Sequence, residues 1–234
     1  HPIPRRQRQM CIRDRYRMFC KRPCFHDQYL QTFNRDNVTL VDTEGQGVER
    51  ITESGVVVAG VEYPVDCIVY ATGFEVGTGF QRVSGFEIYG RDGLSLSDKW
   101  ADGIRTLHGM HIHGFPNCFL MSTIQGGFTV NYPHMLDEVA THVAHIVGHA
   151  LAIEKEVVET SAEAEARWVQ TILDKGVRGG IIGDETCTPG YYNNEGKPRA
   201  HFEQMVSYGD GPIPFFNLLA KWRDTGEFAG LTID

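Results

Sequence analysis

The chain has 234 residues, of which 41% are hydrophobic and 22% are charged, a composition that excludes disordered, collagen-like and coiled-coil proteins. Its longest apolar runs, such as residues 56–61, are far shorter than the roughly 18 residues that cross a bilayer, so we expect no membrane contact. The formal net charge is −8, and residues 1–15 hold five Arg against one Asp, which leaves −12 on the rest of the chain; this acidic body argues against a nucleic-acid partner, because such binding needs a basic face.

The first fifteen residues differ in character from the rest of the chain. They contain neither the apolar stretch of a secretory signal nor an amphipathic period, and residues 9–14 (QMCIRD) resemble translated adaptor sequence from sequencing libraries. We therefore interpret residues 1–15 as an artefactual segment and expect natural sequence, the back part of a longer protein, from about Tyr16 onward. A genuine basic tail is the alternative, since short basic arms are common.

The six Cys residues form neither a CxxC pair nor a dense disulfide framework. Such sparse cysteines are typical of free thiols in a reducing compartment. We therefore predict a cytoplasmic protein.

The first predicted elements are short strands. Residues 37–41 (NVTLV) form a β-branched run, residues 47–58 read as two strands around a Thr-Glu-Ser-Gly turn, and residues 60–63 continue this small antiparallel sheet. Residues 66–73 (DCIVYATG) are predicted to be a buried parallel strand whose carboxyl end opens onto a ligand crevice. A second buried strand is predicted over residues 118–121, before a glycine turn.

Helices are predicted in the second half of the chain. Apolar residues recur at helical spacing from Met135 to Leu151. Thr160 and Glu163 have the spacing of a capping box for a second helix that ends near residue 176. A last helix is predicted over residues 215–223.

Two histidine groups raise the question of a metal site. The second group lies on the long helix at spacings that can place two imidazoles on one zinc ion. The groups are His108, His111 and His113, and then His142, His145 and His149. No HExxH motif or nearby Cys completes a ligand set, so we interpret them as solvated or core residues and predict no metal.

The familiar catalytic and phosphate-binding motifs are absent. The sequence contains no GxSxG, no GxxxxGK[ST] and no GxGxxG, which excludes a nucleophile elbow, a P-loop and a complete dinucleotide fingerprint within this chain. The small residues at the end of the 66–73 strand are by themselves a weak signal, because any buried strand can end in small residues.

Four segments taken together are more specific. Residues 21–23 (KRP), 66–76 (DCIVYATGFEV), 114–133 and 187–198 (CTPGYYNNEGKP) resemble, in order and spacing, the C-terminal half of flavin-dependent Baeyer–Villiger monooxygenases. The resemblance runs from about Tyr16 to the end. The CTPGYYNNEG variant looks closest to the branch that acts on large cyclic, steroid-like or linear ketones.

The resemblance implies an α/β fold with two Rossmann-like dinucleotide-binding domains. Residues 16–65 would be the end of the NADP-binding domain with its small antiparallel sheet, and residues 66–234 the C-terminal part of the FAD-binding domain with C-terminal helices. Family members use FAD and NADPH to insert one oxygen atom of O2 beside a ketone carbonyl, so a ketone and O2 are the expected partners of a monomeric protein. Because the family's FAD and NADP glycine motifs and its catalytic aspartate belong upstream, we expect the chain alone to be inactive.

Two basic residues carry the chemistry that the resemblance implies. Arg22 matches the catalytic arginine, and a guanidinium suits that role because it stays charged and presents a planar fork of donors to developing negative charge. Lys21 matches the lysine that binds the adenosine 2′-phosphate of NADPH. Taken alone, the pair would be read as solvated surface charge.

Further residues match cofactor-binding positions of the family. They are Ala71, Thr72 and Gly73 at the domain junction, Gly126, Gly127, Asn131 and Tyr132 in the segment near the flavin ring, and Asn193 in the CTPGYYNNEG loop. A helix beginning beside Asn131 would stabilise negative charge on the ring. Ordinary helix capping by Asn131 is the alternative.

Two other functions remain open at this point. An N- or S-oxidising flavin monooxygenase would share the 66–73 strand, whereas the Lys21–Arg22 pair and the CTPGYYNNEG loop favour Baeyer–Villiger chemistry. A non-catalytic fragment or interaction domain is the alternative from a different class.

Overall fold

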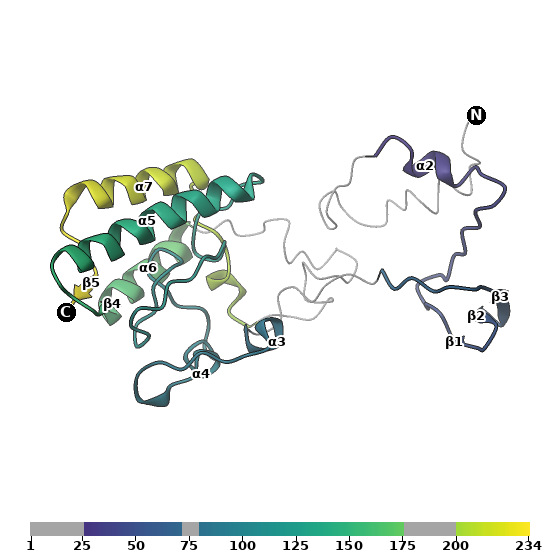
Figure 1. Cartoon of the computed structure of the whole chain (residues 1–234), viewed down its shortest axis with the longest axis horizontal. Coiled ribbons are helices and arrows are strands. Elements are labelled where there is room, and N and C mark those ends of the chain that lie inside the picture. The colour runs from purple at the N-terminus through teal and green to yellow at the C-terminus, as the bar shows by residue number, and fades with distance from the viewer. Residues whose placement is uncertain (1–25, 72–79, 176–199) are drawn as a thin grey trace. The chain divides into compact units, whose positions relative to one another are not determined.

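The computed structural model describes residues 26–71, 80–175 and 200–234, and the chain divides into two compact units (Figure 1). Residues 1–75 and 184–196 form one, here called the sheet unit. Residues 76–183 and 197–234 form the other, here called the helical unit.

The sheet unit contains a short helix and a three-stranded antiparallel meander. Helix α2 spans Tyr29–Thr32, and strands β1 (Arg50–Ile51), β2 (Gly55–Val58) and β3 (Val61–Pro64) pair in the order β1-β2-β3. Val57 and Val58 of the central strand β2 are buried and Val56 is half-buried, as expected for β-branched side chains on a half-buried sheet. The sheet predicted from residues 47–63 is therefore confirmed.

Two strand predictions in this unit are wrong. Residues 37–41 form no strand, and the described part of the predicted buried strand, residues 66–71, is neither paired nor buried. Val69 is 83% exposed and Tyr70 71% exposed. A strand needs neighbouring backbone to pair with, and none of the described residues supplies a partner for this apolar segment.

The helical unit contains longer helices and a two-stranded sheet. Its elements in chain order are α3 (Phe80–Ser84), α4 (Leu96–Lys99), α5 (Tyr132–Ala152), β4 (Val158–Thr160), α6 (Ala162–Lys175), α7 (Pro212–Thr225) and β5 (Leu231–Ile233), with single 3₁₀ turns at Arg91–Gly93 and Phe202–Gln204. Strand β4 pairs antiparallel with β5, and α5 lies alongside α7 (Figure 1). The three helices predicted in this part of the sequence are therefore confirmed as α5, α6 and α7.

Helix α5 forms because its apolar residues share one face. Its buried residues recur every three or four positions: Met135, Val139, His142, Ile146 and Ala150. Burying a side chain of the size of Ile or Met contributes about 1.5–3 kcal/mol, so this stripe holds the helix on the core more strongly than helix propensity does.

None of the helices in the described ranges combines the length and apolar character of a membrane-spanning segment.

Two local predictions need correction. The start of α6 is capped by Ser161, whose Oγ accepts a hydrogen bond from the Ala164 amide at 3.1 Å, and not by Thr160. Thr160 belongs to β4 and donates its hydroxyl proton to the Gly230 carbonyl at 3.0 Å. This hydrogen bond directs the Thr160 side chain to the residue before β5, so it does not cap α6. Residues 118–121 form only an isolated bridge, between Phe119 and His111, in place of a buried strand.

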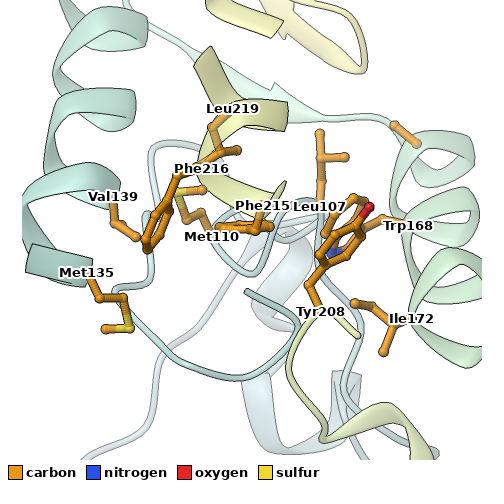
Figure 2. Close-up of a cluster of buried hydrophobic side chains, with 11 residues drawn as sticks. Leu107, Met110, Met135, Val139, Trp168, Ile172, Tyr208, Phe215, Phe216 and Leu219 are labelled. Atoms are coloured by element: carbon orange, nitrogen blue, oxygen red, sulfur yellow. The ribbon is translucent and has the colours of Figure 1, made fainter. Parts of the chain in front are cut away.

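The core of the helical unit lies where α5, α6 and α7 meet the loops around residues 107–110 and 208 (Figure 2). Trp168 of α6 stacks on Tyr208 with ring centroids 5.6 Å apart. Phe215 and Leu219 of α7 are fully buried between them and α5. The chain entering α5 is therefore anchored on an aromatic core.

Candidate functional site

The predicted site residues fall into three groups. Lys21, Arg22, Thr72, Gly73 and Asn193 lie outside the described residues. Ala71 is the last described residue of its stretch in the sheet unit and is exposed. Gly126, Gly127, Asn131 and Tyr132 are described, and they lie close together in sequence before and at the start of α5. The site that can be built from geometry is therefore the segment 125–132.

Gly127 lies against the first turn of α7. A Cβ atom at this position would stand 2.7 Å from Cδ1 of Phe215 and 3.0 Å from Cε1 of Phe216. Real Cβ atoms do not approach aromatic carbons so closely. The absence of a side chain is therefore explained by packing within the helical unit, and a cofactor role for Gly126 and Gly127 stays a prediction.

Gln125, immediately before the two glycines, is fully buried. Its side-chain Oε1 accepts the Thr106 hydroxyl proton at 2.7 Å. Its Nε2 donates to the Ile104 carbonyl at 2.7 Å and to the Gln204 carbonyl at 2.9 Å. One amide side chain thus joins its own turn to residues 104–106 and to Gln204, which are distant in sequence. The sequence analysis missed Gln125, because its position before two glycines is the only local signal of its role.

The backbone of this turn is also held on both sides. The Gln125 amide donates to the Val206 carbonyl at 2.9 Å, and the Gln125 carbonyl accepts the indole proton of Trp168 at 3.0 Å. The Gly126 carbonyl accepts from the Tyr208 amide at 2.9 Å. Gln125 has a φ of 57°, a left-handed conformation that costs a non-glycine residue free energy and persists where surrounding contacts fix it.

Asn131 is the N-cap of α5. Its Oδ1 accepts a hydrogen bond from the His134 amide at 3.3 Å, so the capping interpretation of this residue is confirmed. Because the His134 amide is used in capping and Pro133 has no N–H, the Tyr132 amide is the remaining donor of the first turn, and the helix end carries the partial positive charge of its dipole. The start of α5 is therefore suited to a neighbour with negative charge.

The segment between the turn and the helix presents apolar side chains to solvent. Phe128 is 50% exposed, Val130 98% and Tyr132 46%. Large apolar side chains gathered at one place on a surface indicate a contact with another molecule or another part of the protein. An apolar surface thus adjoins a positively polarised helix end.

Three of the predicted core histidines are buried together. The ring centroids of His108 and His142 are 5.7 Å apart, and those of His111 and His142 are 6.2 Å apart. Burial lowers the pKa of His111 to about 4 and that of His142 to about 3, and lowers the pKa of His108 well below its usual value. Within the described ranges no group of His, Cys, Asp or Glu has the arrangement of a metal site.

A shallow groove of about 400 Å³ lies beside β4 and the start of α6. Its best-buried carboxylate, Glu159, bonds Arg91 Nη2 at 2.7 Å and the Gly114 amide at 2.9 Å. The hydrogen bond and charge of Arg91 lower the pKa of Glu159. The carboxylate is therefore committed to holding the fold.

The chain is similar in sequence to several known monooxygenases and related synthases. No family model matches the chain. The chain is 53% identical over 220 residues to pentalenolactone D synthase of Streptomyces exfoliatus, a match that covers 93% of this chain and 38% of that protein. It is 46% identical over 211 residues to a Baeyer–Villiger monooxygenase of Streptomyces coelicolor, covering 89% of this chain and 34% of that protein.

Solved structures give the same family. The polycyclic ketone monooxygenase of Thermothelomyces thermophila superposes with a TM-score of 0.86 at 37% identity, covering 94% of this chain and 36% of that one. A steroid monooxygenase bound to NADP superposes with a TM-score of 0.72 at 28% identity, covering 88% and 37%. The chain therefore spans a little over a third of the length of the relatives that it matches.

Proposed function

We propose that this chain, a partial homologue of the Baeyer–Villiger monooxygenases, is the C-terminal part of an enzyme that uses FAD, NADPH and O2 to convert a ketone into an ester or lactone. The observation that carries the proposal is the 53% identity over 220 residues to pentalenolactone D synthase. The names of that relative and of the polycyclic ketone monooxygenase favour a cyclic or polycyclic ketone as the substrate class.

We also propose an arrangement of domains. We assign residues 16–65 to the end of an NADP-binding domain and residues 66–234 to the C-terminal part of an FAD-binding domain, both Rossmann-like in the complete protein. The mixed α/β fold matches part of the relatives' structures. We propose that the complete protein is a cytoplasmic monomer.

The described residues fit a flavin at the start of α5. Phe128 and Tyr132 offer apolar surface for a flat ring system, and the N-terminal end of the α5 dipole offers partial positive charge. FAD, when bound, would accept electrons from NADPH and pass them to O2. Asn131 fixes the first turn by capping it, and the helix end would stabilise negative charge beside it.

Arg22 and Lys21 complete the proposal from the part of the chain outside the described residues. A guanidinium at Arg22 would stabilise negative charge that develops as oxygen is transferred to the carbonyl, in a site that excludes water. The ammonium of Lys21 would bind the 2′-phosphate that distinguishes NADPH from NADH.

The test joins the chain to the part that it lacks. Residues 16–234 would be fused behind the section of pentalenolactone D synthase that precedes the matched region, and the purified protein assayed for retained flavin and for NADPH oxidation that depends on added cyclic ketones. We expect a yellow protein with ketone-dependent turnover, whereas the preceding section alone should show none. A fused protein that retains FAD and oxidises amines or sulfides while leaving ketones unchanged would favour N- or S-oxidation instead.

A further inference from the structure

We propose that Gln125 is a positioning residue that holds the segment 126–132 in the place where it meets the flavin. The inference rests on the proposed function, because the segment's neighbour is the flavin only if the complete protein is a flavoenzyme. Its structural half, that Gln125 fixes this segment, stands on the hydrogen bonds alone.

The side chain of Gln125 connects two other segments of the helical unit by hydrogen bonds. It is fully buried, and its three hydrogen bonds reach Thr106, Ile104 and Gln204 at 2.7–2.9 Å. Without the amide, the Ile104 and Gln204 carbonyls would lose this donor and the Thr106 hydroxyl proton its acceptor, and polar groups left without partners in a largely buried place cost more than the bonds themselves. The segments at 104–106 and 204–206 would then lose their common anchor.

The turn is close-packed as well as hydrogen-bonded. Gly109 approaches it so tightly that a Cβ there would stand 2.7 Å from the Ile124 carbonyl oxygen and 3.0 Å from the Gly126 nitrogen. The Gly109 amide donates to the Thr106 hydroxyl group at 3.0 Å, the same hydroxyl group that donates to Gln125. The turn and its support are thus one continuous network, and such fully satisfied buried networks specify a single conformation.

The position of the exposed segment follows from this anchor. After Gln125 the chain lies on Phe215 and Phe216 at Gly127, then becomes exposed at Phe128 and Val130, and enters α5 at Tyr132. The segment has few contacts of its own, so its placement depends on its ends. Gln125 fixes one end and the α5 helix fixes the other, which is the support that a residue near reacting groups requires.

The first experiment uses the chain itself. In Gln125→Met, which keeps the volume of the side chain and removes its amide, the Tyr208 amide should exchange with solvent about tenfold faster or more, as expected when a local structure loses at least one buried hydrogen bond. Trp168→Phe removes the indole donor to the Gln125 carbonyl and also part of the ring that stacks on Tyr208, so it tests the same turn less selectively. Gln170→Met, on the exposed face of α6, is the matched control and should leave this amide unchanged. Unchanged exchange in both turn variants would overturn the proposal.

The second experiment uses the fused, FAD-containing protein. Gln125→Met should alter the visible absorbance of the flavin and raise the hydrogen peroxide released per NADPH, while Gln170→Met should do neither. Gln125→Glu should restore the parent spectrum in part while its carboxyl is protonated, because one O–H replaces two N–H donors, and should lose it at high pH, where the buried carboxyl group ionises. Faster exchange with an unaltered flavin spectrum would show a merely structural residue and overturn the proposal. A spectral change in a protein that makes no ester would instead leave Gln125 in place and overturn the proposed function.

Discussion

Three imidazoles, those of His108, His111 and His142, are buried beside Trp168 and Trp222 with ring nitrogens that find no hydrogen-bond partner among the described residues. Burial is the largest cause that lowers the pKa of His142, and the neighbouring His111, Arg223 on α7 and His145 on α5 lower it further. Nothing in this arrangement favours protonation. The histidines are therefore neutral in the folded protein and tie its stability to pH.

The sign of that dependence follows from the lowered pKa values. An unfolded His takes up its proton near pH 6.5, whereas folded His111 does so near 4 and folded His142 near 3, so the unfolded state binds more protons between these values. Stability present above pH 6.5 is then lost as the pH falls toward the folded pKa values, by about 2 kcal/mol for each histidine at pH 5.

We therefore predict that urea midpoints of the chain fall steeply from pH 7 to pH 5, and that His142→Phe makes the decline clearly shallower. His134→Phe, an exposed position on the same helix, is the control and should keep the parent slope. Equal slopes in the parent and His142→Phe would contradict the prediction.

Gly127 gives a prediction about packing. Gly127→Ala should destabilise the helical unit by about 1–3 kcal/mol, because the new methyl group would collide with the rings of Phe215 and Phe216. Gly148→Ala is the matched control: no atom lies within 4 Å of a Cβ there, and Ala in the interior of α5 should stabilise by about 0.5–1 kcal/mol. Chemical unfolding of both variants checks the opposite signs.

Arg22 gives a prediction about chemistry. In the fused enzyme, Arg22→Ala should reduce ester formation by a factor of about 100–1,000 while NADPH still reduces the flavin, because the missing cation serves oxygen transfer. Arg22→Lys should rescue poorly, since an ammonium restores the charge without the planar fork. Stopped-flow reduction and product analysis separate the two steps. Ester formation by Arg22→Ala at the parent rate would remove Arg22 from the proposed site.

At the scale of elements, one buried carboxylate holds α6 to the rest of the helical unit. Glu165 lies 3.0 Å from Lys99 Nζ and 3.5 Å from Arg105 Nε, and it accepts the His113 amide proton at 2.9 Å. Glu165 is almost fully buried and Lys99 is only 15% exposed. Removing the carboxylate would leave a nearly buried ammonium without its counter-charge.

We expect Glu165→Gln to cost about 3 kcal/mol of unfolding free energy, the usual result of breaking a buried ion pair on one side. Glu163→Gln, an exposed carboxylate in the first turn of the same helix, should change it by less than about 1 kcal/mol. Thermal unfolding of the two variants measures the difference. A loss at Glu163 as large as that at Glu165 would contradict the assignment.

The elements differ in how far the sequence could predict them. Helix α5 was predictable because its stripe of apolar residues repeats at the helical period over many turns. The strand predicted at residues 66–73 failed in its described part, residues 66–71, because an apolar run is not enough and the described residues offer it no partner. The capping prediction at Thr160 failed because Thr160 lies in β4, which pairs with β5, and its hydroxyl group bonds the Gly230 carbonyl. Gln125 was not predictable, since its importance comes from segments distant in sequence.

At the scale of the whole molecule, the chain carries a little over a third of the length of its relatives. The exposed apolar residues of segments 66–71 and 128–132 have no cover among the described residues. The described part of the proposed site is a fixed turn and a helix end.

The most direct test of the central claim is the origin of the oxygen atom in the product. The fused protein would be supplied with NADPH, a cyclic ketone and ¹⁸O2 in ordinary water, and the product analysed by mass spectrometry. The account predicts a lactone that carries one ¹⁸O atom in the ring and forms only when residues 16–234 are present. A flavin-containing fused protein that consumes NADPH and ¹⁸O2 but leaves the ketone unchanged, or yields a product whose new oxygen comes from water, would contradict it.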